Sequence, residues 1–393
     1  MLLEGKVITD LTENDLRAVA EHERECKVVE FKVQLPGNTR EDHKEFLYDV
    51  SSFANASGGH LLYGVDEQAG AAVDFPGLSL TDPDKEIQRL ENITRQGVRP
   101  RIPRVTFHPV QLSNGKCVLI AEVPKSWASP HMVTLRGARP FHSRNSVGKY
   151  PMDVDQIRAA FLLSSTLRER IRDFRVDRLG KIVADELPVH LLGNPKVALH
   201  AIPVGSFAAT STVDISAAMR NQQWRMLTAI TSSRSRINID GLLAYPPPHG
   251  EGCEYQTQLF RTGVVETVDA WVLAALEDGT KRVPYESLEE GILKRCFRIL
   301  SLQRDLGLAP PILLFCAILG ASGYRIRPPN AWQHEVIDRD TLLIPEVWLD
   351  AYPETFLAVI VALKPMFDAI WNASGYESWL NYATWYGRYR AQA

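Results

Sequence analysis

The sequence has few of the features that mark membrane-spanning or secreted proteins. No apolar run is longer than eight residues, as in Phe356–Leu363, whereas a bilayer-spanning helix needs about 20. The first fifteen residues carry acids where a signal peptide would have its apolar core. Only five cysteines occur in 393 residues, and no two form a CxxC pair. This argues against a zinc site or a disulfide framework, so we expect a cytoplasmic protein with no membrane partner.

Several sequence motifs of common enzymes are also missing. There is no GxxxxGK[ST] phosphate loop, no GxGxxG and no GxSxG. These motifs bind nucleotide phosphates or present a nucleophilic serine. We therefore expect no nucleotide cofactor and no serine-hydrolase chemistry.

The length predicts about two domains, and a hydrophobic content of 45% is ordinary for a folded protein. Residues 163–185 are highly charged, with a few apolar residues at helical spacing, and are expected to form a connecting helix. We place one domain at 1–165 and a second at 166–393. The second domain has strands at 197–204, 237–245, 255–268 and 312–319, and a capping box at Ser287 opens a helix. The order of elements predicts the α+β class for the second domain, and we expect the α+β class for the chain as a whole.

Charge is unevenly distributed although the net charge is only −3. Residues 1–94 contain 9 basic and 19 acidic side chains, and residues 95–149 contain 10 basic side chains and a single acid, Glu122. The two blocks could simply pair with each other as solvated faces. Alternatively, the fold places carboxylates beside a surface that attracts phosphate.

The first candidate site lies in the segment from Glu25 to Lys32. Val29 and Phe31 predict a strand whose other face carries Glu30 and Lys32. Glu25 must then come from the turn before the strand. A carboxylate and an ammonium group side by side suit metal-dependent phosphodiester cleavage, although they also occur on many solvated strand edges.

A second element supplies a further acid. Phe46–Ala54 has helical apolar spacing, Gly58-Gly59 ends that helix, and HLLYGV predicts a strand just before Asp66. If this strand lies beside the one carrying Glu30, the carboxylates of Glu25, Glu30 and Asp66 can converge. Three carboxylates suffice to hold Mg²⁺ or Mn²⁺.

The ordered motifs EFK, SSFANASGG and LLYGVDE, followed by RPRIP, VLIAEVPKSWASPHMV and FHSRNSVGKYPMDVDQIRAAF, resemble the Schlafen-type AlbA domain over about residues 10–162. The resemblance implies that Glu25, Glu30 and Asp66 form an acidic metal-binding triad with Lys32 beside it. It further implies cleavage of tRNA or other structured RNA, and a part in anti-phage defence. Animal Schlafens pair two such lobes in one chain, so we expect a homodimer here.

The basic block fits a nucleic-acid partner, with RNA favoured over DNA. The expected phosphate-contacting residues are Lys125, Arg136, Arg139, Arg144 and Lys149, with aromatic side chains between them for unpaired bases. The leading hypothesis is a metal-dependent endoribonuclease. The first alternative is a DNA-binding transcriptional regulator that does not cleave. The second is an interaction scaffold whose C-terminal domain senses a phage protein. Whatever the function, the C-terminal domain could be a sensor, a dimerisation module or a substrate clamp.

Overall fold

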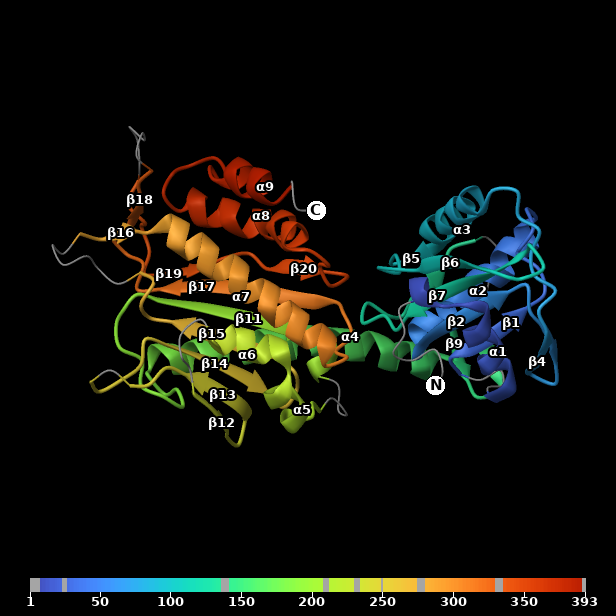
Figure 1. Cartoon of the computed structure of the whole chain (residues 1–393), viewed down its shortest axis with the longest axis horizontal. Coiled ribbons are helices and arrows are strands. Elements are labelled where there is room, and N and C mark those ends of the chain that lie inside the picture. Colours follow the sequence, from blue (N-terminus) through green and yellow to red (C-terminus); the bar gives the residue numbers. More distant parts are fainter. Residues whose placement is uncertain are drawn as a thin grey trace. The chain divides into compact units, whose positions relative to one another are not determined.

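A computed structural model describes residues 8–22, 27–135, 141–207, 212–229, 234–248, 250–273, 280–328 and 335–390. The chain forms two compact units, Met1–Thr166 and Leu167–Ala393, drawn in Figure 1. Each unit mixes helices and strands, so the expected α+β class is confirmed. Within the described ranges, no helix has both the length and the apolar character needed to cross a membrane.

The N-terminal unit is built on a four-stranded sheet with the order β1-β2-β7-β6. These strands are β1 (Val29–Lys32), β2 (Gly58–Tyr63), β7 (Cys117–Pro124) and β6 (Thr106–Gln111). β1 and β2 run parallel, and Glu30 lies opposite Leu61. β6 and β7 form the expected antiparallel hairpin with its Asn-Gly turn. β1, which carries Glu30, and β2, which leads toward Asp66, are therefore neighbours in the sheet.

Helices and hairpins surround this sheet. The helices are α1 (Glu13–His22), α2 (Arg40–Asn55) and α3 (Pro83–Gly97), preceded by the 3-10 turn η1 (Ile8–Asp10). The short strands are β3 (Asp66–Gln68), β4 (Ala71–Asp74), β5 (Val98–Arg99), β8 (Met132–Val133), β9 (His142–Asn145) and β10 (Gly148–Pro151). A capping box between Thr39 and Asp42 begins α2.

The sheet has an apolar layer on each face. On one face, Phe46, Val50 and Phe53 of α2 pack with Leu61 and other alternate strand residues. On the other face, a second cluster contains Val29 and Phe31. Because successive strand residues point to opposite faces, Glu30 and Lys32 lie on the side covered by α2. This side is enclosed by a helix and is not a free surface.

The helix α4 (Val154–Val183) crosses the boundary between the units as one continuous 30-residue helix. Apolar residues at helical spacing after Met152 predict one helix, and the change to a highly charged pattern at residue 163 predicts a second one, over 163–185. The first segment and the charged one share a single helix because nothing between them, neither proline nor glycine, interrupts the backbone.

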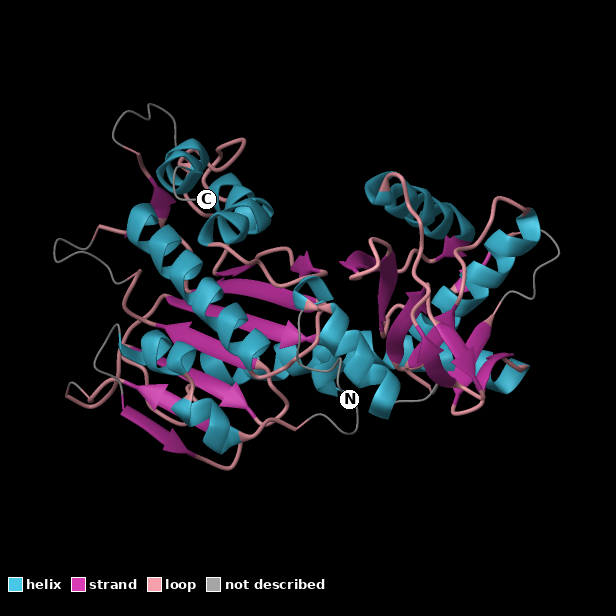
Figure 2. Ribbon diagram, turned by 45° about the vertical axis from the view of Figure 1, so that its right-hand side comes forward, coloured by secondary structure: helices cyan, strands magenta, loops and turns pink. Residues whose placement is uncertain are grey.

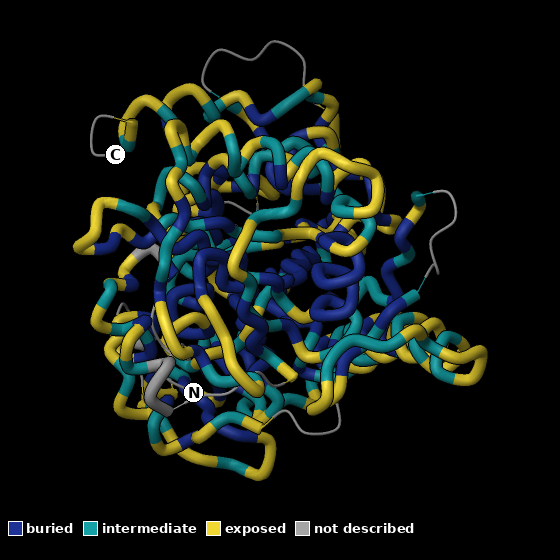
Figure 3. Tube along the Cα trace, turned by 90° about the vertical axis from the view of Figure 1, so that its right-hand side faces the viewer, coloured by how far each residue is buried: buried dark blue, intermediate teal, exposed yellow. Residues whose placement is uncertain are grey.

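The C-terminal unit contains an antiparallel sheet with the order β12-β13-β14-β15-β11-β17-β19, and β20 also pairs with β17. Its strands are β11 (Lys196–Pro203), β12 (Arg234–Ile237), β13 (Gly241–Tyr245), β14 (Tyr255–Phe260), β15 (Val265–Asp269), β17 (Ile312–Leu319), β19 (Thr341–Leu343) and β20 (Val347–Leu349). Two further short strands, β16 (Arg282–Val283) and β18 (Arg325–Ile326), pair only with each other. The long helix α7 (Tyr285–Asp305) crosses these strands in Figure 2. The remaining helices are η2 (Val204–Phe207), α5 (Ile215–Arg220), α6 (Gln222–Ala229), α8 (Phe356–Asn372) and α9 (Tyr382–Arg390). Segments buried within the units are dark blue in Figure 3.

Two strands expected in this unit are corrected, because each contains a turn between two shorter strands. The segment 237–245 turns at Asn238–Asp240 between β12 and β13. The segment 255–268 turns between β14 and β15, where Gly263 has φ +88° and its amide donates to the Phe260 carbonyl. A positive φ is costly for other residues, so this glycine was the available signal for a turn.

Two expectations about helices are also corrected. The helix α7 begins at Tyr285 and has Pro284 as its N-cap without a side-chain hydrogen bond, so Ser287 does not cap it. A proline within a helical pattern predicts an interruption, but Pro365 lies inside α8 and does not interrupt it. Buried Met366, Phe367 and Trp371 continue the apolar face beyond the proline, and their packing outweighs the lost backbone hydrogen bond.

Candidate nucleic-acid site

Glu30 and Lys32 lie side by side on β1, as expected from their spacing. The Lys32 Nζ is 2.5 Å from Glu30 Oε1, and the other Glu30 carboxylate oxygen pairs with the Arg144 guanidinium. The Glu30 side chain is 10% exposed and that of Arg144 is 2% exposed. Glu30 is therefore a buried carboxylate whose two oxygens each have a cationic partner.

A further acid, Asp49 of α2, faces the same lysine. Its Oδ1 accepts a 2.6 Å hydrogen bond from Lys149 Nζ, and its Oδ2 is 3.9 Å from Lys32 Nζ. Asp49 lies three residues after Phe46 and four before Phe53, so helical geometry places it on the apolar face of α2. Asp49 was not among the residues predicted from the sequence, although a carboxylate on an apolar helix face is a recognisable signal.

These side chains form one chain of alternating charge. Lys149 also donates to Glu45 Oε2 at 2.6 Å. We call the whole set the charge chain, which runs in the order Glu45, Lys149, Asp49, Lys32, Glu30 and Arg144. Three carboxylates face three cations, so the set has no net charge when every member is ionised. Three elements are joined by it, because α2, β1 and the β9–β10 hairpin all contribute members.

The pKa shifts follow from burial and from these partners. Burial and the nearby Glu30 charge raise the pKa of Asp49 to about 6, although Lys149 and Lys32 oppose this. Burial also acts to raise the pKa of Glu30, but the Arg144 and Lys32 charges outweigh it and keep the value below normal. The carboxylates of Asp49 and Glu45 hold the pKa of Lys149 above its usual value in spite of burial.

The acids expected to bind metal are not gathered in the described part of the chain. Glu25 lies outside the described residues. Asp66 is exposed on β3, whose backbone pairs with that of β4 opposite Asp74. Among described side chains, no three of His, Cys, Asp or Glu are grouped so that they could hold an ion. Glu30 and Asp66 are only two of the three predicted ligands, so the Mg²⁺ or Mn²⁺ triad with Glu25 stays a prediction.

The basic residues expected to contact phosphate divide into three groups. Arg136 and Arg139 lie outside the described residues. Arg144 is buried and Lys149 is partly buried, and both are committed to carboxylates in the charge chain. Their place differs from the free surface position that the sequence suggested. Lys125 alone among the five is both described and exposed.

We group three exposed basic residues of the block, Arg99, Arg101 and Lys125, under the name cationic rim. Within the described ranges none of the three has a carboxylate partner, and the Arg99 guanidinium donates to the carbonyls of Arg95 and Val98, both at 2.8 Å. The Lys125 ammonium lies 4.4 Å from the centre of the Trp127 ring. Burial, and to a smaller extent the charge of neighbouring Lys27, lower the pKa of Lys125.

Asn55 at the end of α2 holds the parts of the cationic rim together. Its amide nitrogen donates to the carbonyls of His131 (3.0 Å) and His142 (2.8 Å), and its oxygen accepts from the His131 amide at 2.6 Å. His131 Nδ1 lies 2.8 Å from the carbonyl of Pro100, which stands between the two rim arginines. The amide of Ser126, next to Lys125, donates to the Ala54 carbonyl. One helix end thus positions both sides of the rim.

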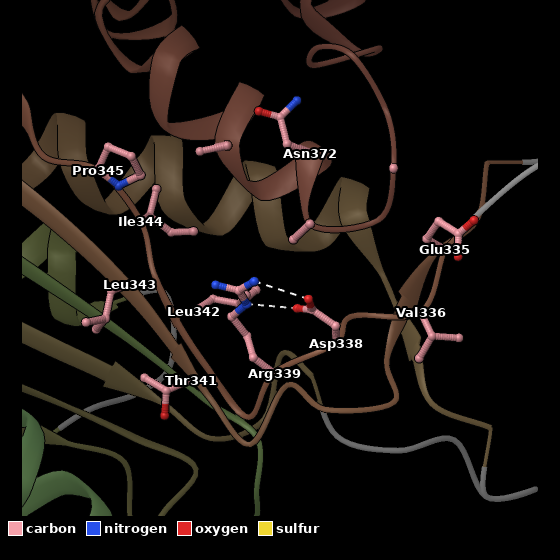
Figure 4. A pocket seen from close by; sticks show the side chains of 13 residues that line it. Glu335, Val336, Asp338, Arg339, Thr341, Leu342, Leu343, Ile344, Pro345 and Asn372 are labelled. Carbon is pink, nitrogen blue, oxygen red and sulfur yellow. Dashed lines mark hydrogen bonds and ion pairs between the residues drawn. The ribbon is translucent and has the colours of Figure 1, made fainter.

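A cavity of about 650 Å³ lies in the C-terminal unit beside β19 (Figure 4). Its charged lining includes the exposed pair of Arg339 Nε and Asp338 Oδ1, 2.8 Å apart, and these two residues are neighbours in the sequence. Figure 4 shows Asn372 of α8 across the cavity from this pair. An exposed pair of this kind does not select a ligand, so the cavity carries no assignment.

Comparisons with known proteins agree with the motifs. Residues 25–153 match the family described as Schlafen, AlbA_2. The N-terminal domain of a RecG-related protein from Nitrosomonas europaea is 25% identical, with a TM-score of 0.28, over 36% of this chain and 92% of its own. The DIP2311 protein of Corynebacterium diphtheriae is 16% identical, with a TM-score of 0.25, over 35% of this chain and 29% of its own. No curated protein matches. The expected resemblance is confirmed, and residues 25–153 of this chain form a Schlafen AlbA_2 domain.

Proposed function

We propose that the N-terminal unit binds nucleic acid, RNA in preference to DNA, through the cationic rim. The observation that carries this proposal is the set of exposed cations without carboxylate partners at Arg99, Arg101 and Lys125. Elsewhere in the same basic block, Arg144 and Lys149 are neutralised by acids. Unpaired Lys and Arg side chains attract a polyphosphate backbone and release its counterions. The AlbA_2 family is often associated with nucleic-acid binding, which supports the proposal.

The preference for RNA depends on Trp127. The indole ring is half-buried and lies beside the Lys125 ammonium, 4.4 Å away. An aromatic face next to a phosphate-binding cation suits an unstacked base, and single-stranded loops of RNA offer such bases more readily than duplex DNA does. Replacement of Trp127 by Ala should therefore weaken binding to tRNA more than binding to duplex DNA.

Lys125 and Lys116 allow a matched test of the rim. They flank the two ends of the eight-residue strand β7, which places them about 31 Å apart at the rise per residue of an extended strand. Lys125→Ala and Lys116→Ala each remove one positive charge from the same domain. In fluorescence anisotropy with tRNA, Lys125→Ala should weaken binding and lower the slope of log K against log salt by about 1. Lys116→Ala should change little, and equal effects of the two variants would count against the rim.

The second candidate function is metal-dependent cleavage of tRNA or structured RNA, with a role in anti-phage defence and a homodimer as the active species. The specific observation in its favour is the Glu30–Lys32 contact on β1, in the strand next to the one that leads into Asp66. Since Glu30 and Asp66 are only two of the three predicted ligands, this candidate depends on Glu25. The purified chain would be incubated with tRNA and Mn²⁺. Cleavage that disappears in Glu30→Gln would support it, and cleavage unchanged in Glu30→Gln would exclude this site.

A further inference from the structure

The charge chain is closed at one end and open at the other. The side chains of Arg144, Asp49 and Glu30 are 2%, 4% and 10% exposed. Lys149 and Lys32 reach solvent at 23% and 38%, and Glu45 does so at 58%. The two lysines therefore lie at the border between the buried network and water. Glu45 is the carboxylate of the set that solvent can reach most easily.

Asp49 keeps the two lysines close together. Its two oxygens face Lys149 Nζ at 2.6 Å and Lys32 Nζ at 3.9 Å. The positive charge of Lys149 acts against protonation of Lys32, which shows that the ammonium groups lie within range of mutual repulsion. A buried carboxylate between two lysines offsets that repulsion. Asp49 thus acts as a positioning residue for a pair of cations that are partly exposed.

We propose that Lys149 and Lys32 form a phosphate-binding subsite for the nucleic-acid backbone, in which the carboxylate of Glu45 takes the place of a phosphodiester when none is bound. This inference rests on the proposed nucleic-acid binding and names a second contact, distinct from the cationic rim. The phosphodiester would replace Glu45 in the ion pair with Lys149, which is 2.6 Å long.

The charge balance fits such an exchange. With Glu45 turned into solvent, the remaining members are Lys149, Lys32, Arg144, Asp49 and Glu30, so three cations face two carboxylates. The residual charge of about +1 equals the charge that one phosphodiester neutralises. The Glu45 side of the pair is screened by solvent, which makes the pair weak, so a phosphate can replace Glu45 at small cost. The buried Asp49 pair keeps Lys149 in place during the exchange.

Glu41 provides a matched control for Glu45. It lies on the same helix, is 72% exposed, and pairs with Lys44 at 2.9 Å. Glu41→Gln and Glu45→Gln each remove one exposed carboxylate and leave one lysine without that partner. They have the same effect on net charge. Only the lysine that pairs with Glu45 belongs to the proposed subsite.

The experiment measures tRNA binding by the full chain at several salt concentrations. We expect Glu45→Gln to tighten binding about two- to fivefold over the wild type, because the competing carboxylate is gone, whereas Glu41→Gln has a smaller effect. In a Lys149→Gln background the Glu45→Gln gain should disappear. Since Lys149→Gln removes a partner of buried Asp49, its folding is checked by circular dichroism, and the comparison of the two Glu variants stands without it.

The outcomes separate the two proposals. If the wild type and both Glu variants bind tRNA with equal affinity, or if the gain persists without Lys149, the subsite is wrong and binding through the cationic rim is unaffected. If none of the proteins binds tRNA or duplex DNA even at low salt, the proposed function is wrong, and the subsite falls with it.

Discussion

The two units bury charge in different ways. In the N-terminal unit the charge chain begins at buried Arg144 and ends at Glu45 in solvent. In the C-terminal unit, Arg178 of α4 makes two 2.8 Å hydrogen bonds to Glu266, which also lies 3.0 Å from His200 Nε2. The Glu266 side chain has no exposed surface. The first network reaches solvent at Glu45, and we call it the open network. The second has a carboxylate with no solvent access, and we call it the sealed network.

The sealed network has a structural explanation. His200 and Glu266 lie opposite each other on the neighbouring strands β11 and β15. Arg178 completes the cluster from α4, which fixes that helix to the sheet. Burial alone would raise the pKa of Glu266, but hydrogen bonds from Arg178 and His200 overcome it and lower the pKa to about 2. A perturbed pKa therefore does not by itself mark a functional site. The difference that bears on function is whether the network reaches solvent.

The largest expected effect comes from breaking the sealed network. Arg178→Met should lower the free energy of unfolding of the C-terminal unit by about 3–5 kcal/mol, because Glu266 keeps its charge in a buried place without its bidentate partner. Affinity for tRNA should not change. Chemical denaturation and anisotropy measure the two quantities. Arg175→Met is the control, since Arg175 lies on the same helix over the Phe315 ring and has no ion pair within the described residues; an equal loss there would contradict the role of the pair.

A third buried acid tests whether a sealed carboxylate needs a cation. Glu289 of α7 is 1% exposed and accepts hydrogen bonds from the indoles of Trp371, Trp379 and Trp385 at 2.7–2.9 Å, and from Asn381 at 3.1 Å. Glu289→Gln should cost about 2–3 kcal/mol, because the amide has one acceptor oxygen for these donors and leaves at least one of them unsatisfied.

The adjacent residue supplies the control for this change. Glu290 is half-exposed and pairs with Lys294 at 2.5 Å on the surface of the same helix. Glu290→Gln should cost under about 0.5 kcal/mol. Thermal unfolding of both variants measures the difference. A similar cost for the two would mean that the indole donors do not matter for the position of α8 and α9.

Periodicity predicted much of the N-terminal fold and little of its charge network. The alternation around Val29 and Phe31 correctly placed Glu30 and Lys32 on one face of a strand. It could not show that α2 covers that face, because which element packs on a strand is a tertiary property. Glu30 was therefore expected at an accessible edge and lies instead beneath a helix, against Arg144.

The same limit explains the outcome for the basic residues. Their number in the sequence predicted a positive surface, but partners cannot be read from composition. Arg144 and Lys149 are opposite each other on the β9–β10 hairpin, and the hairpin turns both toward acids of α2 and β1. Arg99 and Arg101 were counted in the basic block without being singled out, and they lie at the rim because β5 pairs with β8 beside Asn55.

The smallest expected effect distinguishes the two networks by pH. Folding raises the pKa of Asp49 to about 6 from an ordinary value of 3.8, so between these values the folded chain holds a proton that the unfolded chain lacks. The free energy of unfolding should then rise by about 1 kcal/mol as pH falls from 7 to 5. This carboxyl group is also faced by Glu30, Lys32, Lys149 and Tyr63. All four are present in both the wild type and Asp49→Asn, so the comparison of these two proteins isolates the effect of Asp49.

Asp49→Asn should lose this rise, while Glu266→Gln should keep it, because the pKa of Glu266 is lowered to about 2 and its contribution changes only below about pH 4.5. Urea-induced opening of the α2 segment, followed by hydrogen exchange at pH 5 and pH 7, measures the difference. If the wild type and Asp49→Asn respond equally to pH, Asp49 does not titrate in this range. The open network would then be as insensitive to mild acid as the sealed one, and its access to solvent would show only in the binding of phosphate.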